Sequence, residues 1–215
     1  MSCVIGSWGW RHPEWDDDVF YPHDLPREWR LSYYANEFHL VMVPAAYWLA
    51  DGSTEEDWLD DVSGVFTFYI DWPFLQLSDL AAYENCAQQC LSLGQQLAAV
   101  LVDGDIWQKL SAEQKQWFKA VTEPFRRLQY NAVTDAEFAA VYDDQLAAAG
   151  EQLLLLHSDS NESLRELGGR LNQLLQTAAQ KTDEAAHIKH IILSGQSVDI
   201  QRLKELDTLV TLLNI

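Results

Sequence analysis

Acidic and imidazole side chains follow several short apolar runs of this sequence, and these are the groups that could carry chemistry. They are Asp71, Asp103, Asp105, His157 and Asp159. Carboxylates that share a pocket can divide acid and base roles, and oxygen ligands joined by an imidazole nitrogen can hold a divalent metal ion. The competing interpretation is that they are solvated loop residues of an acidic protein. We therefore assign no metal ion and no cofactor from the sequence.

Large aromatic residues crowd the same loops. A concave site with aromatic walls suits a sugar ring or an apolar ligand, but large aromatics also fill cores because each buries much area. Both interpretations stay open. The predicted pocket combines these aromatics with the polar strand ends: Trp8, Trp10, Tyr47, Trp48, Asp71, Trp72, Asp103, Asp105, Asn131, His157 and Asp159.

The elements that would position these residues alternate along the chain. Apolar or β-branched runs predict eight strands, at 2–5, 40–43, 65–70, 98–102, 128–133, 152–156, 188–193 and 208–213. Amphipathic stretches and capping signatures predict helices at 25–38, 54–62, 79–97, 111–125, 134–149, 161–179 and 199–206. Alternation of this kind favours parallel βαβ units. We predict one α/β domain over residues 1–215, a small TIM-like (β/α)8 barrel that lacks the final helix, with a doubly wound open sheet as the alternative.

The composition and charge of the chain disfavour several classes of function. The chain has 215 residues, 14 Lys plus Arg and 33 Asp plus Glu, so its net charge is −19, and 48% of its residues are hydrophobic. Such a chain is too apolar for disorder, and its charge repels nucleic acid. We find no apolar run long enough to span a membrane and no signal peptide. With Cys3, Cys86 and Cys90 interpreted as reduced, buried cysteines, we expect a cytoplasmic protein.

The first fifty residues carry an ordered set of motifs, namely VIGSWGW, HPEW, VFYP and LPREWRLSYYANEF. They resemble the opening of the DUF72 (YecE-like) family. The matching positions are Gly6, Gly9, Trp10, Trp15, Phe20, Tyr21, Pro22, Leu25, Pro26, Tyr33, Tyr34, Ala35 and Phe38. The resemblance implies a TIM-barrel-like fold, in agreement with the strand count.

Several strand-end positions depart from the pattern of that family. Its V-E-x-N aligns with residues 41–44, where Met42 replaces the Glu and Pro44 the Asn. Its third-strand Lys is Asp71 here. The Gln and Pro of its fourth strand align with Asp103 and Asp105, and its fifth-strand V-E-x-R aligns with the uncharged residues 128–131.

Three hypotheses follow. The first is a binding or regulatory protein, with an unknown small ligand or protein partner, that has lost the charged strand-end site of the family. The second is a small-molecule enzyme, a metal-assisted hydrolase or an isomerase, with a rebuilt acidic pocket. The third is a homo-oligomer in which the missing final helix exposes an apolar flank of the barrel. Whether the chain is an enzyme stays open at this point.

Overall fold

Strands and helices alternate along most of the chain. The computed structural model describes residues 3–47, 55–130, 136–138, 140–141, 152–157, 162–181, 188–195 and 198–213. The strands are β1 Val4–Trp8, β2 Leu40–Val43, β3 Thr67–Asp71, β4 Leu97–Asp103, β5 Arg127–Tyr130, β6 Ala136–Phe138, β7 Ala140–Val141, β8 Gln152–His157 and β9 Ile188–Ser194. The α-helices are α1 Arg30–Ala35, α3 Glu55–Asp61, α4 Leu80–Ser92, α5 Gly104–Lys109, α6 Ala112–Val121, α7 Leu164–Lys181 and α8 Ile200–Leu213.

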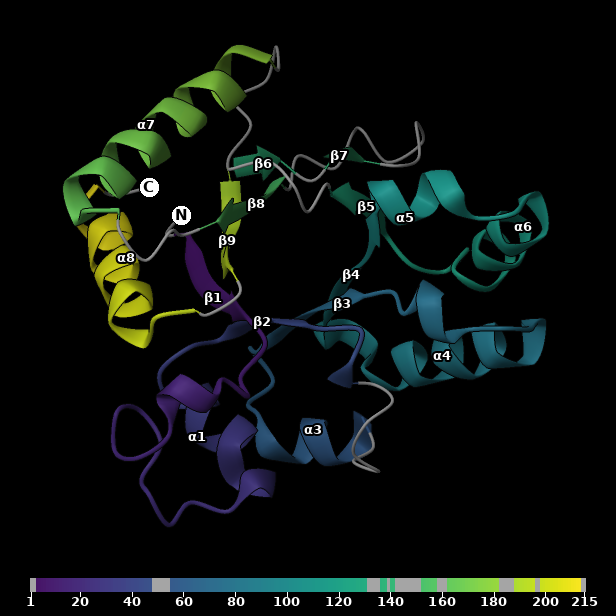
Figure 1. The fold of residues 1–215 in the computed structure, drawn as a ribbon, viewed down its shortest axis with the longest axis horizontal. Coiled ribbons are helices and arrows are strands. Elements are labelled where there is room, and N and C mark those ends of the chain that lie inside the picture. Colours follow the sequence, from purple (N-terminus) through teal and green to yellow (C-terminus); the bar gives the residue numbers. More distant parts are fainter. Residues whose placement is uncertain are drawn as a thin grey trace.

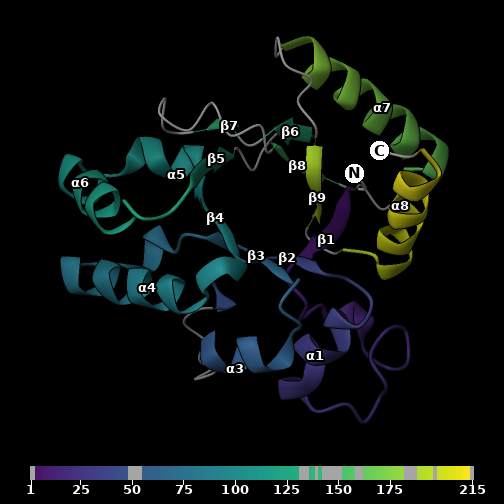
Figure 2. The ribbon, with the colours of Figure 1, turned by 180° about the vertical axis from the view of Figure 1, so that it is seen from behind.

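The strands form one curled sheet in the order β6-β8-β9-β1-β2-β3-β4-β5-β7. All neighbours from β8 to β5 pair in parallel, so this part of the sheet is a half-barrel with helices on its outer side (Figure 1). Seen from behind, the same strands curve between the α7–α8 pair and the α4–α6 group (Figure 2). The prediction of a parallel α/β sheet is confirmed, and the described residues form a TIM-like half-barrel.

Alternating side chains divide the core in two. The inner face of the curl holds a small cluster made of Leu40, Met42, Tyr69, Ala99, Leu101, Leu128, Tyr130, Leu153, Leu155 and Ile192. The outer face packs against the helices in a larger cluster rich in aromatic residues. This alternation decides which strand-end residues can meet inside the curl.

The motif-rich first segment folds as a buried aromatic layer. The Tyr34 hydroxyl donates to the Leu40 carbonyl oxygen at 2.8 Å and accepts from the Ser7 amide at 3.0 Å. Trp15 donates from Nε1 to the Val198 carbonyl oxygen at 2.5 Å, which ties the first loop to the residues before α8. Gly9 has a φ of +85°, and a Cβ there would lie 2.7 Å from the Tyr47 hydroxyl oxygen, so the position requires glycine.

The predicted eighth strand at 208–213 is wrong. These residues form the second half of α8, which buries Leu203, Leu206 and Val210 at helical spacing. A short apolar run cannot by itself distinguish a strand from a buried helix segment. The last described element is therefore a helix, so the prediction that the barrel lacks its final helix is wrong.

The predicted helix at 134–149 is also wrong where the structure describes it. Ala136–Phe138 pairs antiparallel with β8, and Ala140–Val141 pairs antiparallel with β5. The two ends of the parallel arc present unpaired backbone groups, and pairing there outweighs the local capping signature. One residue separates β6 from β7 in the sequence, so a single short segment hydrogen-bonds to both ends of the arc.

The three cysteines are free and buried, as the sequence predicts. Burial raises the pKa of the Cys3 thiol to about 12, so the thiol is inert at neutral pH. None of the helices in the described ranges combines the length and the apolarity needed to cross a membrane.

Candidate functional site

Asp71 is the last residue of β3, at the carboxyl end of the parallel strands. Its side chain is on the inner face because it alternates with Tyr69 of the inner cluster. Its Oδ1 accepts a hydrogen bond from the Tyr130 hydroxyl at 2.8 Å, and its Oδ2 accepts one from the Ala45 backbone N–H at 3.3 Å. Asp71 thereby links the segment after β2 to the end of β5.

Asp103 ends β4, the next strand along the sheet. It caps α5, because its Oδ1 accepts from the backbone N–H groups of Asp105 at 2.8 Å and Ile106 at 3.2 Å. Consecutive strands end at one edge of the sheet, and here this brings two carboxylates within electrostatic range. Asp103 is one of the groups that raise the pKa of Asp71.

An aromatic pair borders these carboxylates. The ring of Trp8, at the end of β1, meets the ring of Tyr130 edge-on, with centroids 5.3 Å apart. Trp8 is half-buried, whereas Tyr130 is buried with its hydroxyl on Asp71. We call Trp8, Asp71, Asp103 and Tyr130 the strand-end site.

Electrostatics make Asp71 unusual within this site. Burial, partly offset by the hydrogen bonds from Tyr130 and Ala45, raises the pKa of Asp71 to about 7. The charge of Asp103 adds to the rise, and within the described part of the chain no cationic side chain is among the groups that shift the pKa of Asp71. Burial and the neighbouring Asp71 also raise the pKa of the Tyr130 hydroxyl. A carboxyl group of this kind exchanges its proton near neutral pH, which is the property of a general acid or base.

Three predicted aromatic residues lie elsewhere. Trp10 is buried against Tyr47 and Trp58 on the outer face, with ring centroids 5.0 and 5.6 Å away. Trp72 packs against Phe118, 5.3 Å between centroids, in the outer core. The Tyr47 hydroxyl accepts from the Arg11 backbone N–H at 2.9 Å. The structure does not bring Trp10 or Trp72 together with Asp71.

The remaining predicted residues fall into two groups. Asp105 is exposed in the first turn of α5, and His157 ends β8 half-buried, with its backbone carbonyl accepting from Arg170 at 2.7 Å. His157 alternates with Leu155, which places it on the inner face. Trp48, Asn131 and Asp159 lie outside the described residues.

Tyr130 belongs to the strand-end site, and the sequence analysis does not predict it. Leu128 and Tyr130 belong to the inner cluster, so Gln129 between them lies on the other face of β5. The charged positions of the family's fifth-strand motif align with residues 129 and 131 instead. Strand alternation was the available signal, because the last inward residue of a barrel strand lies next to the site.

Within the described ranges, no group of three or more His, Cys, Asp and Glu side chains is arranged to hold a metal ion. Asp71 and Asp103 together provide two carboxylates. One oxygen of Asp103 accepts the hydrogen bonds that cap α5.

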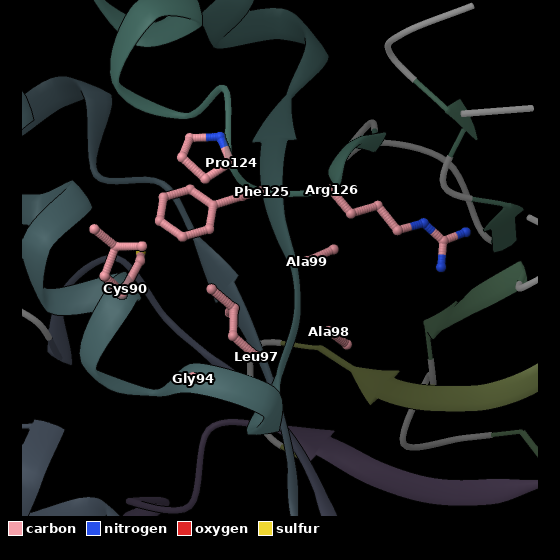
Figure 3. A pocket seen from close by; sticks show the side chains of 9 residues that line it. Cys90, Gly94, Leu97, Ala98, Ala99, Pro124, Phe125 and Arg126 are labelled. Atoms are coloured by element: carbon pink, nitrogen blue, oxygen red, sulfur yellow. The ribbon is translucent and has the colours of Figure 1, made fainter. Parts of the chain in front are cut away.

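A cavity of about 190 Å³ opens at the opposite end of β4, lined by Cys90, Leu97, Phe125 and Arg126 among others. Figure 3 shows the Arg126 side chain extending away from Phe125 and Cys90, so the cavity wall beside these two is apolar. A second hollow of about 400 Å³ lies between the first segment and α3, beside the exposed Trp29. Neither hollow gathers the ionisable groups of the strand-end site.

Comparison with known proteins identifies one family. The family model described as "Protein of unknown function DUF72" matches residues 4–130, from the first strand to the end of β5. No curated protein and no solved structure matches this sequence. The matched range contains all four residues of the strand-end site.

Proposed function

We propose that this chain, which belongs to the DUF72 family of proteins of unknown function, is a binding protein that takes a small, positively charged ligand at its strand-end site. On this proposal the charged strand-end site of the family has been lost. The buried Met42 occupies the position aligned with the family's Glu, and Asp71 occupies that of its Lys. The observation that carries the proposal is that the buried Asp71 carboxyl accepts from Tyr130 and Ala45 within electrostatic range of Asp103, with no cation acting on it from the described residues.

Charge supports a cationic ligand. A half-buried carboxylate beside a second carboxylate is destabilised unless a positive charge or a proton compensates it. Among the described residues, neither Asp71 nor Asp103 forms an ion pair. A bound cation would compensate both carboxylates and would gain from their partial desolvation.

Aromatic surface supports the same ligand class. The half-buried Trp8 lies at the same strand-end edge, edge-on to Tyr130. Aromatic faces attract organic cations, and the attraction increases when the cation is desolvated. Carboxylates together with an indole therefore favour an organic ammonium group over a hydrated inorganic ion.

Thermal unfolding with choline as the probe tests the proposal. The matched ligand control is the uncharged carbon analogue of choline, in which carbon replaces the quaternary nitrogen, at equal ionic strength. We expect choline, and not its analogue, to raise the Tm, because only a ligand that binds the folded state stabilises it. Asp71→Asn and Asp103→Asn should each abolish the shift, and Asn at 103 keeps the helix cap.

The control variant is Asp24→Asn, which removes one negative charge at an exposed loop position. It should respond to choline like the unmodified protein. Equal shifts with choline and its uncharged analogue, or a choline response that persists in Asp71→Asn, would overturn the proposal.

The pKa of Asp71 favours a second candidate, an enzyme with a rebuilt acidic pocket. A carboxyl group that titrates near pH 7 and shares a hydrogen bond with a tyrosine hydroxyl can move a proton to or from a substrate. Turnover on a panel of small polar substrates, abolished by Asp71→Asn and retained by Asp24→Asn, would establish the enzyme. Metal analysis of the purified protein would separate metal-assisted hydrolysis from isomerisation without metal.

A further inference from the structure

We infer that ligand capture at the strand-end site releases one proton, which Asp71 holds in the unliganded protein. The inference rests on the proposed function and adds its regulation, since a ligand that must displace a proton binds more tightly as the pH rises. Its basis is the set of groups that surround Asp71 on the neighbouring elements that the structure describes.

Among the residues that the structure describes, those groups offer hydrogen bonds but no positive charge. From β5, the Tyr130 hydroxyl contacts Oδ1 at 2.8 Å, and from the segment after β2 the Ala45 N–H contacts Oδ2 at 3.3 Å. From β4, the Asp103 carboxylate, which caps α5, acts on Asp71 as a like charge. Strand β2 itself is LVMV and has no ionisable side chain. A proton is therefore the available compensating charge until a cation arrives.

The hydrogen bond between Asp71 and Tyr130 suits such an exchange. When Asp71 is ionised, the tyrosine hydroxyl donates to Oδ1. When Asp71 is protonated, its own O–H can donate to the tyrosine oxygen, because a phenolic hydroxyl is both donor and acceptor. The Ala45 N–H can donate to Oδ2 in both states. The site can thus hold or lose its proton while the heavy atoms keep their positions.

The proton balance of binding is simple. The cationic ligand binds to the protein in which Asp71 is protonated. Asp71 then loses its proton to the buffer and forms an ion pair with the ligand. Below the pKa of Asp71, affinity should rise about tenfold per pH unit, and above it affinity should level off. Since burial raises the pKa of Asp71 to about 7, the change should fall near neutral pH.

Calorimetry with choline tests this coupling, because a quaternary ammonium has no proton of its own to lose. Titrations in two buffers of different ionisation enthalpy give the number of protons released. We expect nearly one proton at about pH 5.5 and none at about pH 8.5, with the Kd falling about tenfold per pH unit at the acidic end. Asp24→Asn should behave like the unmodified protein.

Carbon-detected NMR of the Asp71 carboxyl in the unliganded protein separates the two proposals. Choline binding with a Kd independent of pH would overturn the coupling and leave the binding function standing. If the protein binds no choline at any pH, the binding function is overturned. If the Asp71 carboxyl of that protein still titrates near neutral pH, the conclusion that Asp71 holds a proton is unaffected. A titration near the ordinary pKa of aspartate would overturn the coupling directly.

Discussion

The buried aromatic layer of the first segment, which contains Trp15, Tyr21 and Tyr34, and the strand-end site both contain Trp and Tyr side chains. The two regions differ in the hydrogen-bond partners of their polar atoms. In the layer, Trp15 and Tyr34 each donate to a backbone carbonyl, as does Tyr21, whose hydroxyl reaches the Trp10 carbonyl at 2.5 Å. In the strand-end site, the Tyr130 hydroxyl donates to a carboxylate that has a second carboxylate beside it.

This difference separates residues that hold the fold from residues that can respond to a ligand. Neutral donors on backbone acceptors are complete in the folded chain and gain nothing from a further partner. A buried carboxylate without a compensating cation is destabilised, so the binding of a proton or a cationic ligand lowers its free energy strongly. The motif residues Trp15, Tyr21 and Tyr34 stand in the first group, and Asp71, which departs from the motif, stands in the second.

Trp15→Ala should produce the largest effect and should break the aromatic layer alone. The side chain is fully buried, packs against Phe20 with centroids 5.3 Å apart, and bonds to Val198. Loss of a buried Trp costs about 3–5 kcal/mol. Denaturant unfolding should show this loss at all pH values, and a loss of less than about 1 kcal/mol would contradict the structural role of the layer.

Asp71→Asn should change the pH dependence of stability. The folded-state pKa of Asp71 is raised from 3.8 to about 7, so the folded protein binds this proton more tightly than the unfolded chain. The stability from Asp71 is therefore complete below about pH 4 and is lost as the pH rises to about 7. At about 1.4 kcal/mol per pKa unit, the loss is at most about 4 kcal/mol.

The variant cannot ionise, so it should be more stable than the unmodified protein at about pH 8 and comparable to it below about pH 4. Denaturant unfolding across this range measures the difference. Asp24→Asn removes the same charge at an exposed position, and its free energy of unfolding should depend on pH in the same way as that of the unmodified protein. A variant that tracks the unmodified protein at every pH would show that Asp71 does not hold the proton.

Tyr34→Phe should give an intermediate effect that is independent of pH. It removes a hydroxyl that donates to the Leu40 carbonyl and accepts from the Ser7 amide, and it leaves those buried groups without that partner. Such losses cost about 1–3 kcal/mol. Denaturant unfolding at one pH below 7 and one above 7 measures the loss in free energy of unfolding and shows whether that loss depends on pH. Choline binding should be unchanged, because Tyr34 lies outside the strand-end site.

The parallel sheet and part of the site could be predicted from the sequence. Apolar runs located the seven strands of the half-barrel, and Asp71 and Asp103 were expected at one edge because they end consecutive strands. Residues 208–213 were misinterpreted because a short apolar run fits strand and helix alike. The strands at 136–138 and 140–141 were hidden because their pairing depends on distant edges.

The partners of Asp71 depend on information that the sequence does not display locally. Tyr130 reaches Asp71 across β4, which requires the register Asp103↔Tyr130 between β4 and β5. Ala45 contributes only its backbone N–H, so its residue type gives no signal. Trp8 was expected in a loop but ends β1, which brings it next to Tyr130.

Tyr130→Phe should give the smallest change and the sharpest test of how the two regions differ. The Tyr130 hydroxyl lowers the pKa of Asp71 against the larger effect of burial, so its removal should raise that pKa further. The lost hydrogen bond is worth about 1 kcal/mol, and that amount corresponds to less than one pKa unit. NMR titration of the Asp71 carboxyl should show its midpoint moving upward, whereas in Tyr34→Phe the midpoint should stay in place. A downward shift in Tyr130→Phe would mean that the hydroxyl stabilises the protonated carboxyl more than the ionised one, which would contradict the effect assigned to this hydrogen bond.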